Sequence, residues 1–184
     1  MSVDRSQLLI LGLGNVICQD DGLGIVAVER LLERYEPPPG VEIHDGGTMG
    51  LSLLTWATET DTLLMVDAIR TGEAPGTLVR MEGDEVAPAV RDRLSVHQIG
   101  VADLLDGMRL FDRYPPKLLL LGIVPESMEL STERTPAVER ALPRLVEAVA
   151  EEAAALGHPL IPREASHAST PHAPRPAAVA LGLR

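Results

Sequence analysis

Carboxylates follow three apolar segments of this sequence. Asp20 and Asp21 come after the apolar run that opens the chain, Asp45 follows VEIH, and Asp67 lies near the end of DTLLMVDAI. A histidine, His97, precedes a further segment of apolar residues at helical spacing. Carboxylate oxygen combined with imidazole nitrogen suits a borderline divalent ion such as nickel or zinc. A site with three such ligands leaves coordination positions open. A functional metal site needs these open positions, whereas a structural site has all of them filled by the protein.

Each of these residues also has an ordinary structural role open to it. Asp20 and Asp21 could cap the helix that follows, where acidic side chains favour the N-terminal dipole, although adjacent carboxylates repel one another. Asp45 stands before two glycines and could form a turn. His97 could cap a helix or belong to the core. Asp67 is the hardest to explain in this way, because burying a charge without a partner costs free energy.

Two other kinds of site are weaker candidates. Gly12 and Gly14 resemble the start of a dinucleotide-binding turn, but Ile17 stands where the motif needs a third glycine for close helix packing. The two aspartates nearby would also repel a pyrophosphate. Cys18 with His97 could form a thiolate pair, yet nothing near Cys18 activates it, and it is expected to pack as a small hydrophobic residue. No serine stands in a G-x-S-x-G elbow.

Apolar runs and helical spacings alternate along the chain. Strands are predicted at 7–15, 41–47, 61–69, 76–83 and 115–126, and helices at 22–35, 49–60, 97–111 and 135–157. Several of these strands are apolar on both faces, which predicts a single α/β domain with a mostly parallel sheet sandwiched between helices. Because parallel strands end at the same edge of a sheet, the aspartates and His97 are expected to converge there.

Composition and net charge limit the classes of molecule that the protein is expected to bind. The chain has 184 residues and a net charge of −11, so we expect one domain and neither a nucleic-acid nor a membrane partner. A single cysteine and the lack of a membrane-spanning apolar run favour a cytoplasmic protein, and a monomer is the default expectation. The domain is expected to span 1–157, and the Pro-, Ala- and His-rich segment 158–184 is predicted to be a flexible tail.

Several motifs match one protein family together and in order. They run from about Leu9 to about Leu156: GLGNVICQDDGLG, HDGGTMG, VDAI, the PGT of APGT, SVHQIG and LLGIVPES. In this the chain resembles the nickel–iron hydrogenase maturation proteases, especially those that process the large subunits of membrane-bound uptake hydrogenases. The resemblance implies a parallel-rich sheet between helices. It also implies an endopeptidase that cuts a C-terminal extension from the hydrogenase large-subunit precursor after nickel has been inserted.

The resemblance also implies roles for individual residues. The metal contacts of the family fall on Asp21, Asp67 and His97, and the acidic residue at the position of Asp21 is Glu in some members. Asp45, in the DGGT motif, matches a position that is also tied to processing. Nickel would be delivered in the precursor as a recognition element, so it is not a resident cofactor.

The sequence leaves open how the hydrolytic water is activated and whether the protein is an enzyme or a metallochaperone. The hydrolytic water could be activated by the metal, or Asp21 or Asp45 could act as the general base. A non-enzymatic nickel metallochaperone or assembly factor could use the same three ligands, but it should hold nickel by itself.

Overall fold

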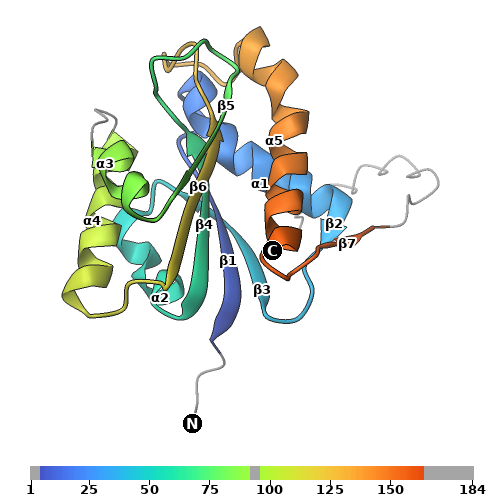
Figure 1. Cartoon of the computed structure of the whole chain (residues 1–184). Helices are drawn as coiled ribbons and strands as arrows, with labels where there is room; N and C mark the ends of the chain where they lie inside the picture. Colours follow the sequence, from blue (N-terminus) through green and yellow to red (C-terminus); the bar gives the residue numbers. More distant parts are fainter. Residues whose placement is uncertain (1–4, 92–95, 164–184) are drawn as a thin grey trace, which may run out of the picture.

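A five-stranded sheet forms the centre of the molecule. The computed structural model describes residues 5–91 and 96–163, with the backbone alone for residues 91 and 96–99. The strand order is β3-β1-β4-β6-β5 (Figure 1). The strands are β1 (Ser6–Leu13), β3 (Val41–Gly47), β4 (Thr60–Ala68), β5 (Leu78–Glu82) and β6 (Lys117–Ile123). All neighbours are parallel except β5 and β6, so the predicted mostly parallel sheet is confirmed.

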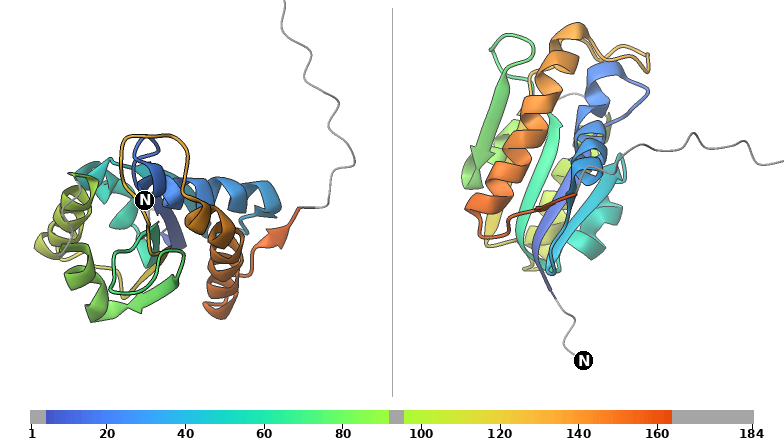
Figure 2. Two further views of the ribbon diagram at one scale, coloured as in Figure 1. Left: turned by 90° about the horizontal axis from the view of Figure 1, so that it is seen from above. Right: turned by 90° about the vertical axis from the view of Figure 1, so that its right-hand side faces the viewer.

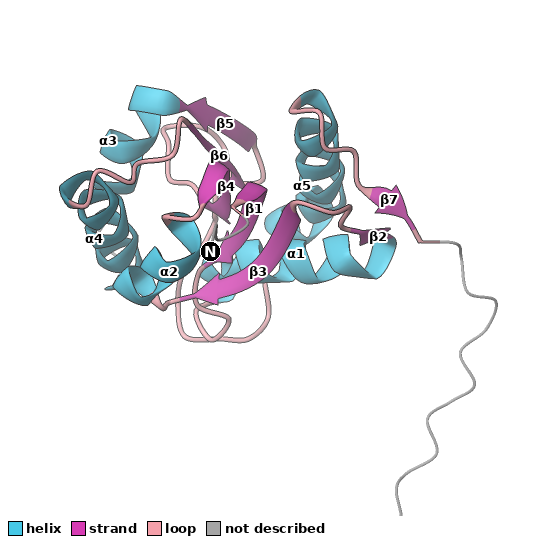
Figure 3. Ribbon diagram, turned by 90° about the horizontal axis from the view of Figure 1, so that it is seen from below, coloured by secondary structure: helices cyan, strands magenta, loops and turns pink. Residues whose placement is uncertain are grey.

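Helices cover both faces of the sheet, as Figures 2 and 3 show. One face carries α1 (Leu23–Arg34) and α5 (Pro136–Ala155). The other carries α2 (Leu54–Ala57), α3 (Val86–Arg91) and α4 (Val96–Leu110). Three short 3-10 helices complete the connections: η1 (Gln19–Gly22), η2 (Gly50–Leu53) and η3 (Gly83–Glu85). None of the described helices is both long and apolar enough to cross a membrane.

Side chains of the central strands alternate between two aliphatic cores. Leu8 and Ile10 of β1 pack in the core under α1 and α5, whereas Leu9 and Leu11 pack in the core under α4. All four side chains have no exposed surface. Each buried leucine or isoleucine contributes about 1.5–3 kcal/mol relative to an exposed one. The continuous apolar runs of the sequence are therefore strands buried on both faces.

Two segments differ from the sequence-based expectation. The helix predicted over 49–60 is shorter, because η2 and α2 end at Ala57 and β4 begins at Thr60. The domain also continues past residue 157. Leu160 is buried, and β7 (Ile161–Pro162) pairs antiparallel with β2 (Tyr35–Glu36). Residues 158–163, assigned above to the tail, thus pack on the domain, and the remaining tail residues 164–184 lie outside the described part of the chain.

The helix α1 lies unusually close to the sheet. A Cβ atom on Gly24 would lie 2.1 Å from the carbonyl oxygen of Val66 and 2.4 Å from that of Leu13. A Cβ atom on Gly12 would lie 2.5 Å from the carbonyl oxygen of Gly24. The expectation that Ile17 deprives the helix of close packing is therefore wrong. In this chain η1 lies between the glycine-rich turn and α1, so the helix starts later in the sequence than in the dinucleotide-binding motif. Gly24 is therefore the glycine that packs against the sheet.

We predict that Gly24→Ala destabilises the fold. Its new methyl group would meet two backbone carbonyls, which cannot move aside as a side chain can, so the expected loss is about 1–3 kcal/mol of unfolding free energy. Urea denaturation measures it. The control is Gly72→Ala, whose Cβ would meet no atom within 4 Å. Equal denaturation midpoints for both variants would contradict the close-packing account.

Candidate functional site

The sheet has a switch point at its centre. From β1 the chain passes to β3 on one side and then to β4 on the other. In open α/β sheets this reversal opens a crevice at the carboxyl ends of the two strands, where ligands bind. Here those strands are β1 and β4. The first leads into η1, which carries Asp21, and the second carries Asp67 next to its last residue.

Asp21 is held by the glycine-rich turn. The residue is 3% exposed, and its Oδ2 accepts a hydrogen bond from the Asn15 N–H at 3.1 Å. Gly14 has a φ of +128°, and a Cβ atom there would lie 1.9 Å from the Asp21 carbonyl oxygen. Only glycine allows the turn to fold back so closely over η1. Gly14 thus lets the turn close over η1, where the Asn15 N–H bonds the Asp21 carboxylate.

Asp67 lies on the central strand next to that turn. It is 1% exposed, and its Oδ1 accepts a hydrogen bond from the Ala68 N–H at 2.7 Å. Its strand position pairs with Gly122 of β6, and η1 lies against β4. Asp21 and Asp67 are therefore two buried carboxylates at the same edge of the sheet, as the sequence predicted.

The helix that bears His97 starts at this edge too. His97 lies in the first turn of α4. One turn later, Gly100 lies against Gly50 of the connection after β3, where a Cβ atom on Gly50 would be 2.8 Å from the Gly100 Cα. The side chain of His97 lies outside the described residues, so its role as a third ligand stays a prediction. Among the side chains that are described, no three of His, Cys, Asp and Glu are arranged as metal ligands.

Asp45 forms a turn at the carboxyl end of β3. Its Oδ1 accepts a hydrogen bond from the Gly47 N–H at 2.8 Å, and the residue is exposed. It pairs in register with Gly12 of β1, which pairs in turn with Val66 of β4. Two strand spacings, about 10 Å, thus separate it from β4. The turn-forming role is confirmed, and a catalytic role for the same carboxylate stays a prediction.

Asp20 does not cap the helix that follows it. Its side chain has no exposed surface and reaches instead to the connection between β6 and α5. Its Oδ2 accepts hydrogen bonds from the N–H groups of Glu126 and Ser127 and from the hydroxyl of Thr135, and its Oδ1 accepts one from the Thr135 N–H. The sequence contained no signal that distinguishes this residue from its neighbour Asp21.

Large apolar side chains are exposed on the loops around this edge. They come from the connections after β1, β3 and β6: Val16, Ile17, Met49, Leu51 and Leu130. Two of the loops are tied together, because the Ser131 N–H donates to the Ile17 carbonyl oxygen at 3.0 Å. Figure 2 shows these two loops side by side at the end of the molecule where α1 and α5 begin. We call these five side chains the apolar rim.

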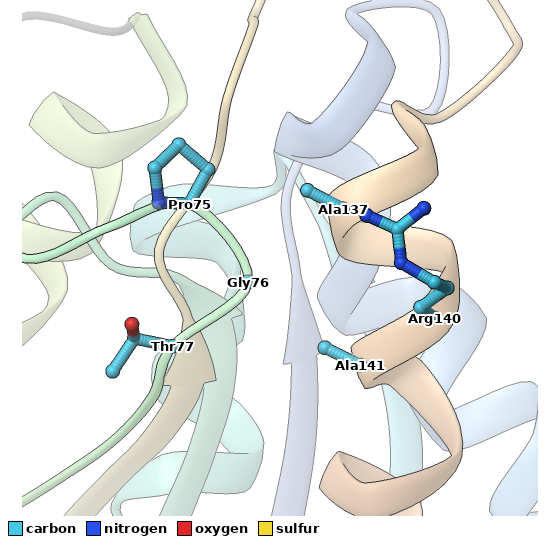
Figure 4. Close-up of a pocket in the computed structure, with 6 residues that line it drawn as sticks. All are labelled: Pro75, Gly76, Thr77, Ala137, Arg140 and Ala141. Carbon is cyan, nitrogen blue, oxygen red and sulfur yellow. The ribbon is translucent and has the colours of Figure 1, made fainter.

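An open groove of about 410 Å³ lies farther along the same edge. Its lining comes from the connection between β4 and β5 and from α5: Pro75, Gly76, Thr77, Ala137, Arg140 and Ala141 (Figure 4). Backbone hydrogen bonds from Gly76 to Val124 and from Val124 to Thr77 join this connection to the residue that follows β6. Arg140 is the charged member of the lining, and none of the aspartates discussed above belongs to it.

Comparison with known proteins assigns the family. The sequence model of the hydrogenase maturation proteases matches residues 25–152. The hydrogenase 2 maturation protease of Escherichia coli is 40% identical over 162 residues, which cover 88% of this chain and 99% of that protein. The chain belongs to the hydrogenase maturation protease family. A hydrogenase expression/formation protein of Azotobacter vinelandii, HoxM, is 43% identical over 123 residues, which cover 66% of the chain and 59% of that protein.

Solved structures of the family share the fold. The hydrogenase maturating endopeptidase of Escherichia coli superimposes with a TM-score of 0.81 at 38% identity, over 85% of this chain and 98% of that one. A maturation protease of Thermococcus kodakarensis gives a TM-score of 0.64 at 28% identity, over 80% and 99%. The resemblance noted in the sequence is thus confirmed, and the protein is an endopeptidase of hydrogenase maturation.

Proposed function

We propose that the protein removes the C-terminal extension of a nickel–iron hydrogenase large-subunit precursor and recognises the nickel ion that this precursor carries. The observation that supports the proposal is the burial of two carboxylates, Asp21 and Asp67, at the switch point of the sheet. Membership of the family is the reason to assign peptide-bond hydrolysis to the protein. The two buried carboxylates are the reason to propose a substrate that carries a cation. We place the reaction in the cytoplasm, since the single cysteine suits a reducing compartment.

Nickel recognition follows from the free energy of buried charge. A carboxylate taken out of water is costly unless opposite charge compensates it. A divalent ion held by the precursor brings that charge, and Asp21, Asp67 and His97 would complete its ligand sphere with oxygen and nitrogen. A precursor without nickel offers no such compensation. The same residues therefore bind the substrate and check that it is loaded.

We assign the general base to Asp45. Asp21 and Asp67 are buried and, on this proposal, occupied by the metal, whereas Asp45 is exposed to water. Its hydrogen bond from the Gly47 N–H fixes the orientation of the carboxylate. In that position it can take a proton from the water that attacks the scissile carbonyl. Asp21, which lies at the metal, is the second candidate for this role.

The apolar rim supports a protein substrate. Single apolar side chains scattered over a protein surface are normal. A group of them on the loops around a site marks a protein-binding surface. The rim side chains come from the connections that follow β1, β3 and β6, and these connections leave the same edge of the sheet as Asp21 and Asp67. They would cover the precursor surface next to its nickel, and the water excluded there would strengthen the contact of nickel with the carboxylates.

Two isosteric variants should separate recognition from chemistry. Asp67→Asn is expected to abolish binding of the nickel-loaded precursor. Asp45→Asn keeps an oxygen for the turn, so it should bind the precursor normally and lose about 10²–10⁴-fold in kcat. Affinity for the precursor and single-turnover cleavage measure the two effects. Normal processing by a folded Asp67→Asn protein would remove the metal assignment. A wild-type kcat in Asp45→Asn would exclude Asp45 as the base and leave Asp21 or the metal to activate the water.

A pair of leucines tests the apolar rim. Leu130 is 82% exposed within the rim, and Leu110 is 81% exposed at the end of α4, which leads to the amino end of β6. We expect Leu130→Asp to raise KM for the precursor about tenfold, because one buried leucine is worth about 1.5 kcal/mol or more. Leu110→Asp should leave KM unchanged, and neither variant should alter Tm. The same KM in both variants would show that the precursor does not touch the rim.

A further inference from the structure

We propose that Asp20 is a positioning residue, which fixes the carboxylate of Asp21 by tying η1 to the connection between β6 and α5. The inferred effect of Asp20 on processing rests on the proposed function. The inferred effect of Asp20 on the position of Asp21 rests on the hydrogen bonds of Asp20. These reach across the chain to residues 106 to 115 positions later in the sequence.

The Asp20 carboxylate is saturated with donors. Four hydrogen bonds of 2.8–3.1 Å reach its two oxygens, three of them from backbone N–H groups of Glu126, Ser127 and Thr135. Charge-assisted bonds of this kind are the stronger ones in proteins. Backbone bonds flank the carboxylate, from Asp20 N–H to Ser127 and from Gln19 N–H to the carbonyl of Ser131. The two loops are thereby joined into one unit beside the switch point.

A shift of η1 would displace Asp21 directly. Asp20 and Asp21 are consecutive residues of the same short 3-10 helix. The Asp21 N–H donates to the Cys18 carbonyl oxygen, and its Oδ2 accepts from the Asn15 N–H. Any loosening of η1 therefore changes the distance between the Asp21 carboxylate and the Asn15 amide. That amide reports on the position of Asp21 without any substrate.

The same bonds explain how two adjacent aspartates are tolerated. Adjacent carboxylates repel one another in a low-dielectric interior. The donors from the β6–α5 connection offset the charge of Asp20, so Asp21 is the one left to face a cation. Asp20 itself is unsuited to touch the substrate, because it has no exposed surface and its oxygens are already engaged. Its effect on the reaction must pass through Asp21.

Thr135→Val is the sharpest test. It removes the hydroxyl that donates to Asp20 Oδ2 at 2.8 Å and keeps the shape of the side chain and the Thr135 N–H bond. Although Thr135 precedes α5, its side chain makes no capping bond to that helix. The start of α5 is therefore undisturbed. Thr135→Ser restores the hydroxyl and is expected to restore whatever the valine variant loses.

Thr60→Val is the matched control. Thr60 is 1% exposed, and its hydroxyl donates one hydrogen bond, to the Thr62 carbonyl oxygen, at the same 2.8 Å. It lies at the start of β4, the opposite end of the strand from Asp67. Each valine variant loses one part-buried hydroxyl bond of 2.8 Å, and the bond of Thr135 differs in being charge-assisted. The Tm values of the two valine variants show how much stability each of them loses.

Two readouts decide the outcome. We expect Thr135→Val to lower kcat/KM about fivefold or more and to speed hydrogen exchange of the Asn15 amide, while Thr60→Val changes neither. Equal effects of the two variants on both readouts, or no effect of Thr135→Val on the Asn15 amide, would overturn the inference. If the wild-type protein fails to process a nickel-loaded precursor, the proposed function falls, and the exchange rate of the Asn15 amide still decides the role of Asp20.

Discussion

Negative charge buried at the carboxyl edge of the sheet is the constraint on which this structure depends. Asp20, Asp21 and Asp67 have between 0% and 3% of their surface exposed, and each would prefer water unless compensated. The chain compensates them in different ways. Asp20 is saturated by backbone and hydroxyl donors, whereas Asp21 and Asp67 accept bonds from the backbone beside them. Asp20 therefore has a structural environment that differs from those of Asp21 and Asp67, the two acids that we propose to contact a cation.

The surrounding architecture serves that arrangement. Gly24 lets α1 lie directly on the central strands, and Gly14 lets the preceding turn close over Asp21. The connection from β6 to α5 folds back to supply the donors for Asp20. Site geometry and fold stability thus share the same few contacts at the switch point. The loops of this edge expose the apolar rim, so the buried acids lie within a surface suited to another protein.

Much of this was predictable from sequence, because apolar runs fix the central strands and parallel strands end at one edge. The convergence of Asp21 with Asp67 followed from that rule, and the resemblance to the family suggested the roles that we propose for them. Other features depend on partners that no local pattern reveals. Asp20 and Asp21 are identical neighbours, and only donors more than a hundred residues later distinguish them. The packing role of Gly24 depends on the inserted η1, and the order at 158–163 depends on pairing with β2.

On the proposed function, the protein recognises its substrate through the nickel that the substrate carries. The most direct test is to incubate the protein with a large-subunit precursor, with and without nickel in its active site, and to record the precursor mass. We expect loss of a C-terminal peptide from the nickel-loaded form alone. Equal cleavage of both forms would contradict nickel recognition. No cleavage of either form, together with tight binding of nickel by the protein alone, would favour a metallochaperone.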